Sequence, residues 1–186
     1  EAVVRLLLEM KIPSVMGNHE LALADAQYLS WFNVLARKSI HLTEQELSPR
    51  SLEYCRSLPS SLSLFGCLHV HGCPPDRILT YIFEASTADL ARAMDNMKER
   101  ICFVGHTHLL ELFGFDGIGV FKSDLGPARI SLPGPAKFVI NAGSVGQPRD
   151  GDRSAKYVVW DDETCFLETR FVPYDHKKTA RKILAK

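Results

Sequence analysis

The chain has 186 residues, of which 46% are hydrophobic and 24% charged, a composition typical of one globular domain. Lys plus Arg and Asp plus Glu number 22 each, so the formal net charge is zero. This balance argues against a general nucleic-acid or membrane-surface binder, because such proteins need a basic excess. It is compatible with a small anionic substrate, since a bound metal ion would supply positive charge locally.

The cysteines indicate reduced thiols rather than a disulfide framework. They are odd in number and never in C-x-x-C spacing: Cys55, Cys67, Cys73, Cys102 and Cys165. We therefore expect buried thiols in a cytoplasmic protein. Because no apolar run approaches the ~18 residues of a membrane span, we expect no membrane segment.

The first half of the chain alternates helical and strand patterns. Residues 1–11 form an amphipathic helical pattern that begins without a cap residue, which indicates a fragment of a longer chain. A strand is expected at 12–16, followed by helical stretches at 21–38 and 44–57. A hairpin at 62–70 ends at His71, and a helix at 87–100 precedes a buried strand at 101–104.

The second half is dominated by short β segments separated by Gly, Pro and Asp, followed by a basic helix. The β segments are 109–115, 119–122, 128–132, 137–140, 157–160 and 165–171, and the helix is 175–186. Strands that alternate with helices and then form hairpins predict a layered α/β domain with mixed sheets.

Three of these strands end in segments with metal-binding residue types. Gly17-Asn18-His19-Glu20 follows the first strand, where Asn18 offers an amide oxygen and His19 an imidazole; ordinary turn chemistry is an equal alternative. His69-Val70-His71-Gly72 closes the hairpin. His71, at the strand end, is favoured as a ligand, whereas His69 is expected to be a partly buried or surface histidine.

Gly105-His106-Thr107-His108 follows the buried strand 101–104, so two imidazoles can point into one cavity. Imidazole nitrogen suits Zn, Fe, Ni and Mn in mixed nitrogen and oxygen sites. An isolated H-x-H is a weak signal, but here it accompanies the other strand-end histidines. A fourth segment, residues 141–149 (NAGSVGQPR), contains small residues that let the backbone approach a ligand, and it contains no obvious ligand itself. Arg149 at its end is a candidate phosphate contact, with a surface arginine as the alternative.

The succession G-N-H-E, H-G, G-H-T-H and N-A-G-S-V-G-Q-P-R resembles the calcineurin-like metallophosphoesterase superfamily, and its last segment is similar to the small prokaryotic phosphodiesterase branch. The resemblance covers residues 16 to about 160. It implies a four-layer α/β/β/α sandwich with mixed sheets that hydrolyses phosphodiesters or phosphomonoesters. It also implies that Asn18, His71 and His106 bind one metal, that His108 binds the other, and that His19 assists the leaving group.

The chemistry suits these residue types. Two divalent ions ~3.5–4 Å apart can clamp the attacking and leaving oxygens of a phosphate ester, and a nearby imidazole can protonate the departing oxygen. We expect two divalent ions, Mn²⁺ or Fe in preference to Zn²⁺ or Ni²⁺. The expected partner is a small phosphorylated substrate. The sequence does not define the oligomeric state.

The D-x-H and G-D segments with which the family pattern begins do not occur before Gly17. We therefore expect residues 1–186 to form a single metallophosphoesterase domain that lacks its first βαβ unit, about 30 residues. Activity of the chain by itself is then uncertain. The remaining aspartates do not end apolar strands and are expected at the surface or in turns: Asp76, Asp116, Asp124, Asp150 and Asp152.

Two other functions compete with a phosphoesterase. One is a non-catalytic interaction scaffold on the same fold, as in one subunit of retromer; a scaffold does not require His19 together with the three metal-binding histidines. The other is a structural zinc protein, which would use closed tetrahedral coordination with cysteine ligands. The cysteine spacing argues against it.

Overall fold

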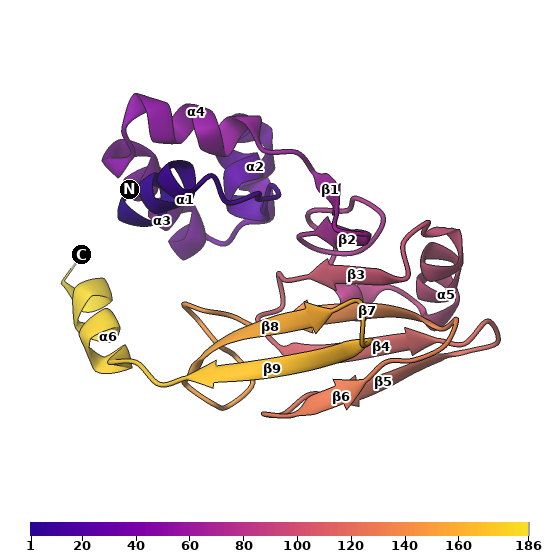
Figure 1. Ribbon diagram of the computed structural model, residues 1–186. Helices are drawn as coiled ribbons and strands as arrows, with labels where there is room; N and C mark the ends of the chain where they lie inside the picture. Colours follow the sequence, from indigo (N-terminus) through magenta and orange to yellow (C-terminus); the bar gives the residue numbers. More distant parts are fainter. Residues whose placement is uncertain (186) are drawn as a thin grey trace.

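The computed structural model describes residues 1–185, which form two β-sheets, one group of helices at the N-terminal end and two separate helices, α5 and α6 (Figure 1). The larger sheet has the strand order β1-β2-β3-β7-β4-β5 and the smaller one β6-β9-β8. The strands are β1 (Ser61–Leu64), β2 (Cys67–Val70), β3 (Ile101–Val104), β4 (Leu110–Phe115), β5 (Val120–Asp124), β6 (Arg129–Ser131), β7 (Lys137–Ala142), β8 (Ala155–Asp161) and β9 (Phe166–Val172). The helices are α1 (Ala2–Met10), α2 (Asn18–Ala24), the 3₁₀ helix η1 (Ala26–Trp31), α3 (Val34–Glu46), α4 (Pro49–Ser57), the 3₁₀ helix η2 (Ile82–Glu84), α5 (Thr87–Asn96) and α6 (His176–Leu184).

The larger sheet is mixed. Strand β3 runs parallel to both β2 and β7, whereas β4 runs antiparallel to β7. The prediction of an α/β domain with mixed sheets is therefore confirmed. Because β2 and β3 are parallel neighbours, their carboxyl ends lie at the same edge of the sheet, and the loops after them meet there.

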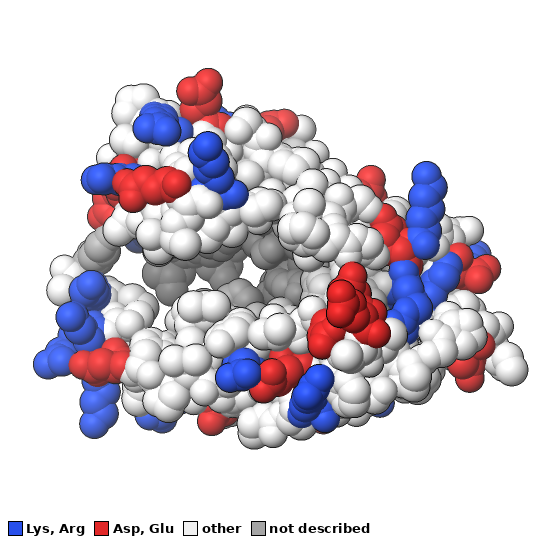
Figure 2. Space-filling model, viewed as in Figure 1, with Lys and Arg blue, Asp and Glu red and all other residues white. Residues whose placement is uncertain are grey.

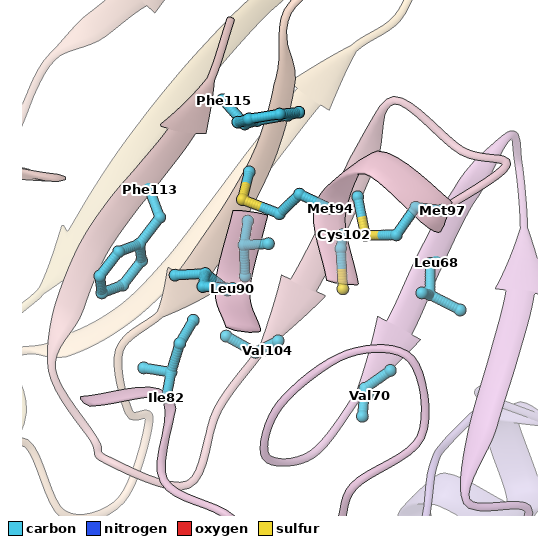
Figure 3. Close-up of a cluster of buried hydrophobic side chains, with 11 residues drawn as sticks. Leu68, Val70, Ile82, Leu90, Met94, Met97, Cys102, Val104, Phe113 and Phe115 are labelled. Carbon is cyan, nitrogen blue, oxygen red and sulfur yellow. The ribbon is translucent and has the colours of Figure 1, made fainter. Parts of the chain in front are cut away.

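Two apolar cores hold the sheets and α5 together. Helix α5 covers one face of the larger sheet through a cluster that includes Leu90, Met94 and Phe113 (Figure 3). Met94 and Cys102 in this cluster are fully buried. A second cluster, which includes Ile140 and Leu167, fills the space between the two sheets. Packing on both faces fixes the central strands and therefore the edge at which β2 and β3 end.

Helices α1 to α4 form a separate group with a small core of their own, built on Ala22, Leu23, Ile40 and Cys55. Figure 1 shows this group apart from strand β8, and Figure 2 shows the molecule hollowed between the two. On the face shown in Figure 2, the charged side chains lie mainly on the outer surface rather than along the hollow.

Most expected elements occur within a few residues of the predicted limits, and β3 occupies the predicted residues 101–104. Two expectations were wrong. Residues 12–16 form no strand, because Pro13 lies within them and no strand pairs with them. Ile12 N donates to Leu7 O in the preceding helix (3.0 Å), and Met16 N donates to Pro59 O (2.8 Å). The single helix expected over 21–38 is divided into α2, η1 and α3, since Asp25 and Asn33 each cap the next helix with a side-chain oxygen.

All five cysteines are free thiols, four of them buried. No helix in residues 1–185 has the length and apolar character that a membrane crossing requires.

Candidate active site

A cavity of about 560 Å³ opens where the loops after β2 and β3 face helix α2 and the start of α3. It contains every residue to which the sequence assigned a role in the site: Asn18, His19, His71, His106, His108 and Arg149. These residues come from four separate segments of the chain. The fold therefore brings all of the candidates together, whereas His69 is not among the lining residues.

Three donor atoms converge in the cavity. His71 Nε2 lies 3.0 Å from Asn18 Oδ1 and 3.1 Å from His106 Nδ1. Metal–nitrogen bonds of about 2.1 Å place neighbouring ligand atoms roughly 3.0–3.4 Å apart in octahedral or tetrahedral coordination. The two separations in the cavity therefore fit adjacent ligands of a single ion.

Backbone carbonyls orient two of the imidazoles. His106 Nε2 lies 3.2 Å from Leu79 O, and His108 Nδ1 lies 2.8 Å from Gln147 O. A carbonyl accepts hydrogen bonds only, so the contacted nitrogen in each ring must carry the proton. The other nitrogen, Nδ1 of His106 and Nε2 of His108, then keeps its lone pair for a ligand. Metal-binding histidines are held in the same way.

Burial keeps these imidazoles neutral. It lowers the pKa of His71 to about 3, and the neighbouring His106, His108 and His19 add to the effect. The pKa values of His106, His108 and His19 are also lowered, chiefly by burial. Neutral imidazole is the form that binds a metal ion.

The G-H-T-H segment has an unusual backbone. His106 and His108 both have left-handed conformations, with φ of 65° and 62°, which non-glycine residues seldom adopt. Such a conformation costs about 1–2 kcal/mol in a residue with a side chain, and it persists where the surroundings enforce it. The two left-handed residues flank Thr107.

Asn141, from the fourth segment, holds this turn in place. Its buried side-chain amide donates hydrogen bonds of 2.8 Å to Gly105 O and 2.7 Å to Thr107 Oγ1. Its Oδ1 accepts a 3.2 Å hydrogen bond from Gly143 N. The sequence analysis identified the segment but assigned no role to Asn141. A polar residue at the end of an otherwise apolar strand was the signal that could have revealed it.

Helix α2 places Asn18 and His19 at the cavity. The main-chain N–H of Gly17 donates a 3.1 Å hydrogen bond to Glu20 Oε2, which closes the first turn of the helix. A Cβ atom at Gly17 would lie 2.7 Å from the same oxygen and 3.1 Å from His71 Cε1, so a side chain there would displace the Glu20 carboxylate and press on the His71 ring. The His19 ring meets Phe32 edge-on, with their centroids 5.2 Å apart.

The loop between β2 and η2 supports His106 from the other side. Tyr81 stacks on the His106 ring with the centroids 3.9 Å apart and an interplanar angle of 12°. Gly72 allows this loop to fold tightly, because a Cβ there would lie 2.4 Å from Arg77 O and 2.6 Å from Thr80 O. Tyr81 was another residue that the sequence analysis did not assign.

Acidic ligands are scarce in the cavity. Among the described residues, only Glu20 and Glu84 line it with a carboxylate, and each accepts a main-chain hydrogen bond at the start of its own helical turn. In residues 1–185, no three side chains of His, Cys, Asp or Glu are grouped so that they could hold a metal ion. The converging set thus consists of two imidazoles and an amide oxygen.

The remaining candidates are placed as follows. Arg149 is exposed at the cavity rim, and its main-chain N–H donates a 3.1 Å hydrogen bond to His108 O. His69 is half-buried and stacks on Phe103 at 5.4 Å. None of the five aspartates considered from the sequence lines this cavity. Asp150 and Asp152 instead pair with the buried Lys156.

Known proteins are similar to this chain in both sequence and fold. The uncharacterized protein MJ0912 of Methanocaldococcus jannaschii is 30% identical over 186 residues, which cover 97% of this chain and 73% of that protein. The crystal structure of a metallophosphoesterase from Sphaerobacter thermophilus superposes with a TM-score of 0.72 at 28% identity, covering 92% of this chain and 70% of that one. This chain belongs to the calcineurin-like metallophosphoesterase superfamily.

A structure of the protein PH1004 from Pyrococcus horikoshii also shares the metallophosphoesterase fold. Its TM-score is 0.73 at 18% identity, and the alignment covers 99% of this chain and 72% of that one. No family model matches the chain. Metallophosphoesterases in general use divalent metal ions. The lone-pair donors that converge on His71 Nε2 fit such an ion.

Proposed function

We propose that this metallophosphoesterase domain hydrolyses phosphate esters, either diesters or monoesters, with two divalent metal ions. Asn18, His71 and His106 would hold one ion, and His108 would contribute to the other. Mn²⁺ or Fe suits this mixed set of nitrogen and oxygen donors better than Zn²⁺ or Ni²⁺. The observation that carries the proposal is the convergence of Asn18 Oδ1 and His106 Nδ1 on His71 Nε2 at 3.0 and 3.1 Å.

The metal ions, when bound, would neutralise the phosphoryl oxygens and activate water. The residues of the chain would do the rest. Arg149 at the rim would attract the phosphate group. His19, whose ring contacts Phe32, would be protonated when a phosphate is bound beside it, because that negative charge raises the pKa of the imidazole. It would then give its proton to the departing alcohol oxygen, as a general acid does.

We further propose that the domain is completed by a βαβ segment that contributes the carboxylate ligands. Two surfaces support this. Strand β8 is an edge strand of its sheet in the described residues, and Tyr157 and Val159 on it are exposed. Helix α1 exposes the apolar row Val3, Leu6 and Met10, spaced as one helical face. Native proteins usually cover both unpaired strand edges and uncovered apolar helix faces.

The test is hydrolysis of bis-p-nitrophenyl phosphate with added Mn²⁺, combined with a count of bound metal. We expect residues 1–186 to bind one Mn²⁺ weakly and to turn over slowly or not at all. A version extended upstream by the family's first βαβ unit should bind two ions and hydrolyse the ester. In that version His19→Ala should reduce kcat by about 10²–10⁴-fold, the range of a general acid, and should leave the metal count unchanged.

The scaffold alternative predicts that the extended chain binds no metal. If the extended chain bound no metal by direct counting, the phosphoesterase proposal would fail and a non-catalytic interaction function would remain. Rapid turnover by residues 1–186 would instead overturn the proposed completion by a further segment, and would require carboxylate ligands among the residues described.

A further inference from the structure

One wall of the cavity is aromatic. Trp31 is the last residue of η1 and Phe32 follows it, and both line the cavity that contains the histidines. The lining also includes the polar side chains of Gln147 and Arg149. A cavity lined by both aromatic rings and a guanidinium fits a ligand with one planar apolar part and one anionic part.

The two aromatic side chains differ in what they do for the fold. Phe32 is half-buried and packs against the small core of the helical group. Trp31 is not part of that core, and 72% of its surface is exposed. Folding of the helical group therefore leaves the indole free for a ligand. Free tryptophan side chains at the rim of a cavity are well suited to stacking, because the large ring loses little conformational entropy on binding.

The segment that carries Trp31 is anchored at both ends. The main-chain N–H of Phe32 donates a 3.1 Å hydrogen bond to Leu29 O, which closes η1. Asn33 begins α3, and its side-chain oxygen accepts a 2.9 Å hydrogen bond from Ala36 N. The aromatic pair is thus presented by a short, capped segment and not by a long loop, so the wall is preformed.

His19 relates this wall to the reaction. Its ring contacts Phe32 edge-on at 5.2 Å, so it lies beside the aromatic wall. In the proposed function, which this inference requires, His19 protonates the alcohol oxygen that leaves. The alcohol portion of the ester then lies on the side of Phe32 and Trp31, while the phosphoryl group lies towards His71, His106 and Arg149.

From this arrangement we infer that the substrate is a phosphate ester whose alcohol portion carries a planar aromatic ring, and that Trp31 is the residue that selects it by stacking. The ring can belong to a nucleobase or to a simple aryl group, since both present a π face. Small alkyl esters reach the same phosphate position but leave the indole uncovered.

Binding of non-hydrolysable phosphonates tests the inference independently of turnover. Calorimetry with Mn²⁺ present would compare phenylphosphonate with methylphosphonate, first with residues 1–186 and then with the extended chain. We expect phenylphosphonate to bind at least about fivefold more tightly, the lower limit of aromatic stacking. Trp31→Ala should abolish this preference and leave the affinity for methylphosphonate unchanged. A third titration, with adenosine 5′-monophosphate, shows whether the site binds a nucleobase or a phenyl ring more tightly. Either order of affinities supports the ring subsite.

Two variants control for non-specific effects. Leu35, four residues after Trp31, is exposed and does not line the cavity, so Leu35→Ala removes an apolar side chain outside it. Trp160→Phe alters the other tryptophan. Both should keep the preference for phenylphosphonate. Equal binding of the two phosphonates, or a preference that survives Trp31→Ala, would overturn the inference.

Metal binding, measured in parallel without phosphonate, separates this inference from the proposed function. Bound Mn²⁺ with no ring preference would overturn the aromatic subsite and leave the metal site standing. A ring preference that depends on Trp31, found without bound Mn²⁺, would overturn the metal site and, with it, the assignment of the ring to a substrate of hydrolysis. Loss of both would overturn both.

Discussion

The side-chain amide of Asn141 donates a 2.7 Å hydrogen bond to the hydroxyl oxygen of Thr107, and both residues are buried. Asn141 is the penultimate residue of strand β7 and Thr107 lies in the turn after β3, so this bond joins two parallel strands near their carboxyl ends. It fixes the turn in which His106 and His108 adopt left-handed backbone conformations. The position of both imidazoles therefore depends on a residue that is not itself a candidate ligand.

Substitution Asn141→Ala should loosen this turn. It removes both hydrogen bonds that the amide donates and leaves Gly143 N without its acceptor. We expect a loss of about 1–3 kcal/mol in the free energy of unfolding. Mn²⁺ affinity, measured by calorimetry, should fall about 10- to 100-fold, the range found for groups that orient metal ligands.

Ser86→Ala is the matched control for Asn141→Ala. Ser86 caps α5 by accepting a 3.1 Å hydrogen bond from Asp89 N, and neither residue lines the cavity. Its loss should cost about 1 kcal/mol without a change in Mn²⁺ affinity. If the two variants weakened Mn²⁺ binding equally, Asn141 would act only through general stability.

Substitution Gly72→Ala should disturb the loop that supports His106. The added Cβ would lie within 2.8 Å of three main-chain oxygens, those of Arg77, Ile78 and Thr80. Because main-chain atoms cannot move independently of one another, the whole loop must shift. Leu79 O, which contacts His106 Nε2, would shift with it. We expect a loss of about 1–3 kcal/mol in chemical denaturation and weaker Mn²⁺ binding.

Gly105→Ala provides the comparison for Gly72→Ala. Its nearest neighbour would be His71 O at 3.8 Å, an ordinary van der Waals contact. We therefore expect Mn²⁺ affinity close to that of the unaltered chain. A Gly105→Ala protein as impaired as Gly72→Ala would contradict the steric account of this loop.

Tyr81→Leu should weaken metal binding by freeing the His106 ring. The stacked contact at 3.9 Å restricts that ring, and aromatic pairs contribute about 0.5–1.5 kcal/mol beyond their buried area. Mn²⁺ affinity should consequently fall about two- to tenfold. Tyr81→Phe keeps the stacked ring and should bind Mn²⁺ normally. Equal losses in both variants would instead assign the effect to the phenolic hydroxyl.

Met94→Ala should destabilise the whole domain. Met94 is fully buried between α5 and the larger sheet, and its truncation leaves a cavity. Such changes cost about 2–5 kcal/mol, which circular dichroism would detect as a lower midpoint of thermal unfolding. Val145→Ala, at an exposed position, should change stability by about 0.5 kcal/mol or less. A small effect of Met94→Ala would mean that α5 contributes little to the core.

Local signals in the sequence were sufficient to predict much of the structure. The buried strand 101–104, the hairpin before His71 and the cap of α5 by Ser86 are each encoded by neighbouring residues, through apolar runs, turn residues and a capping serine. The same signals put Asn18, His71 and His106 at the ends of apolar segments. Because strand ends meet at a sheet edge, the candidate site could be predicted without knowledge of the distances within it.

Other features follow from contacts between distant residues. Residues 12–16 have the composition of a strand, but a strand needs a partner strand for its main-chain hydrogen bonds. In the described residues their N–H groups bond only Leu7 O of the preceding helix and Pro59 O. The division of 21–38 into α2, η1 and α3 depends on which of several polar residues caps a helix, and packing of the helical group decides that.

The sequence by itself determined the fold class, the order of the strand-end motifs and the identity of the histidines, because these depend on residue type and short-range pattern. The tertiary structure alone decided that His71 and His106, 35 residues apart, lie 3.1 Å from each other. It also decided that Asn141 fixes the turn that contains His106 and His108 and that Trp31 is left uncovered at the cavity. Such relationships arise because the packing of parallel strands and helices brings residues that are distant in the chain into contact. A local sequence pattern does not contain this information.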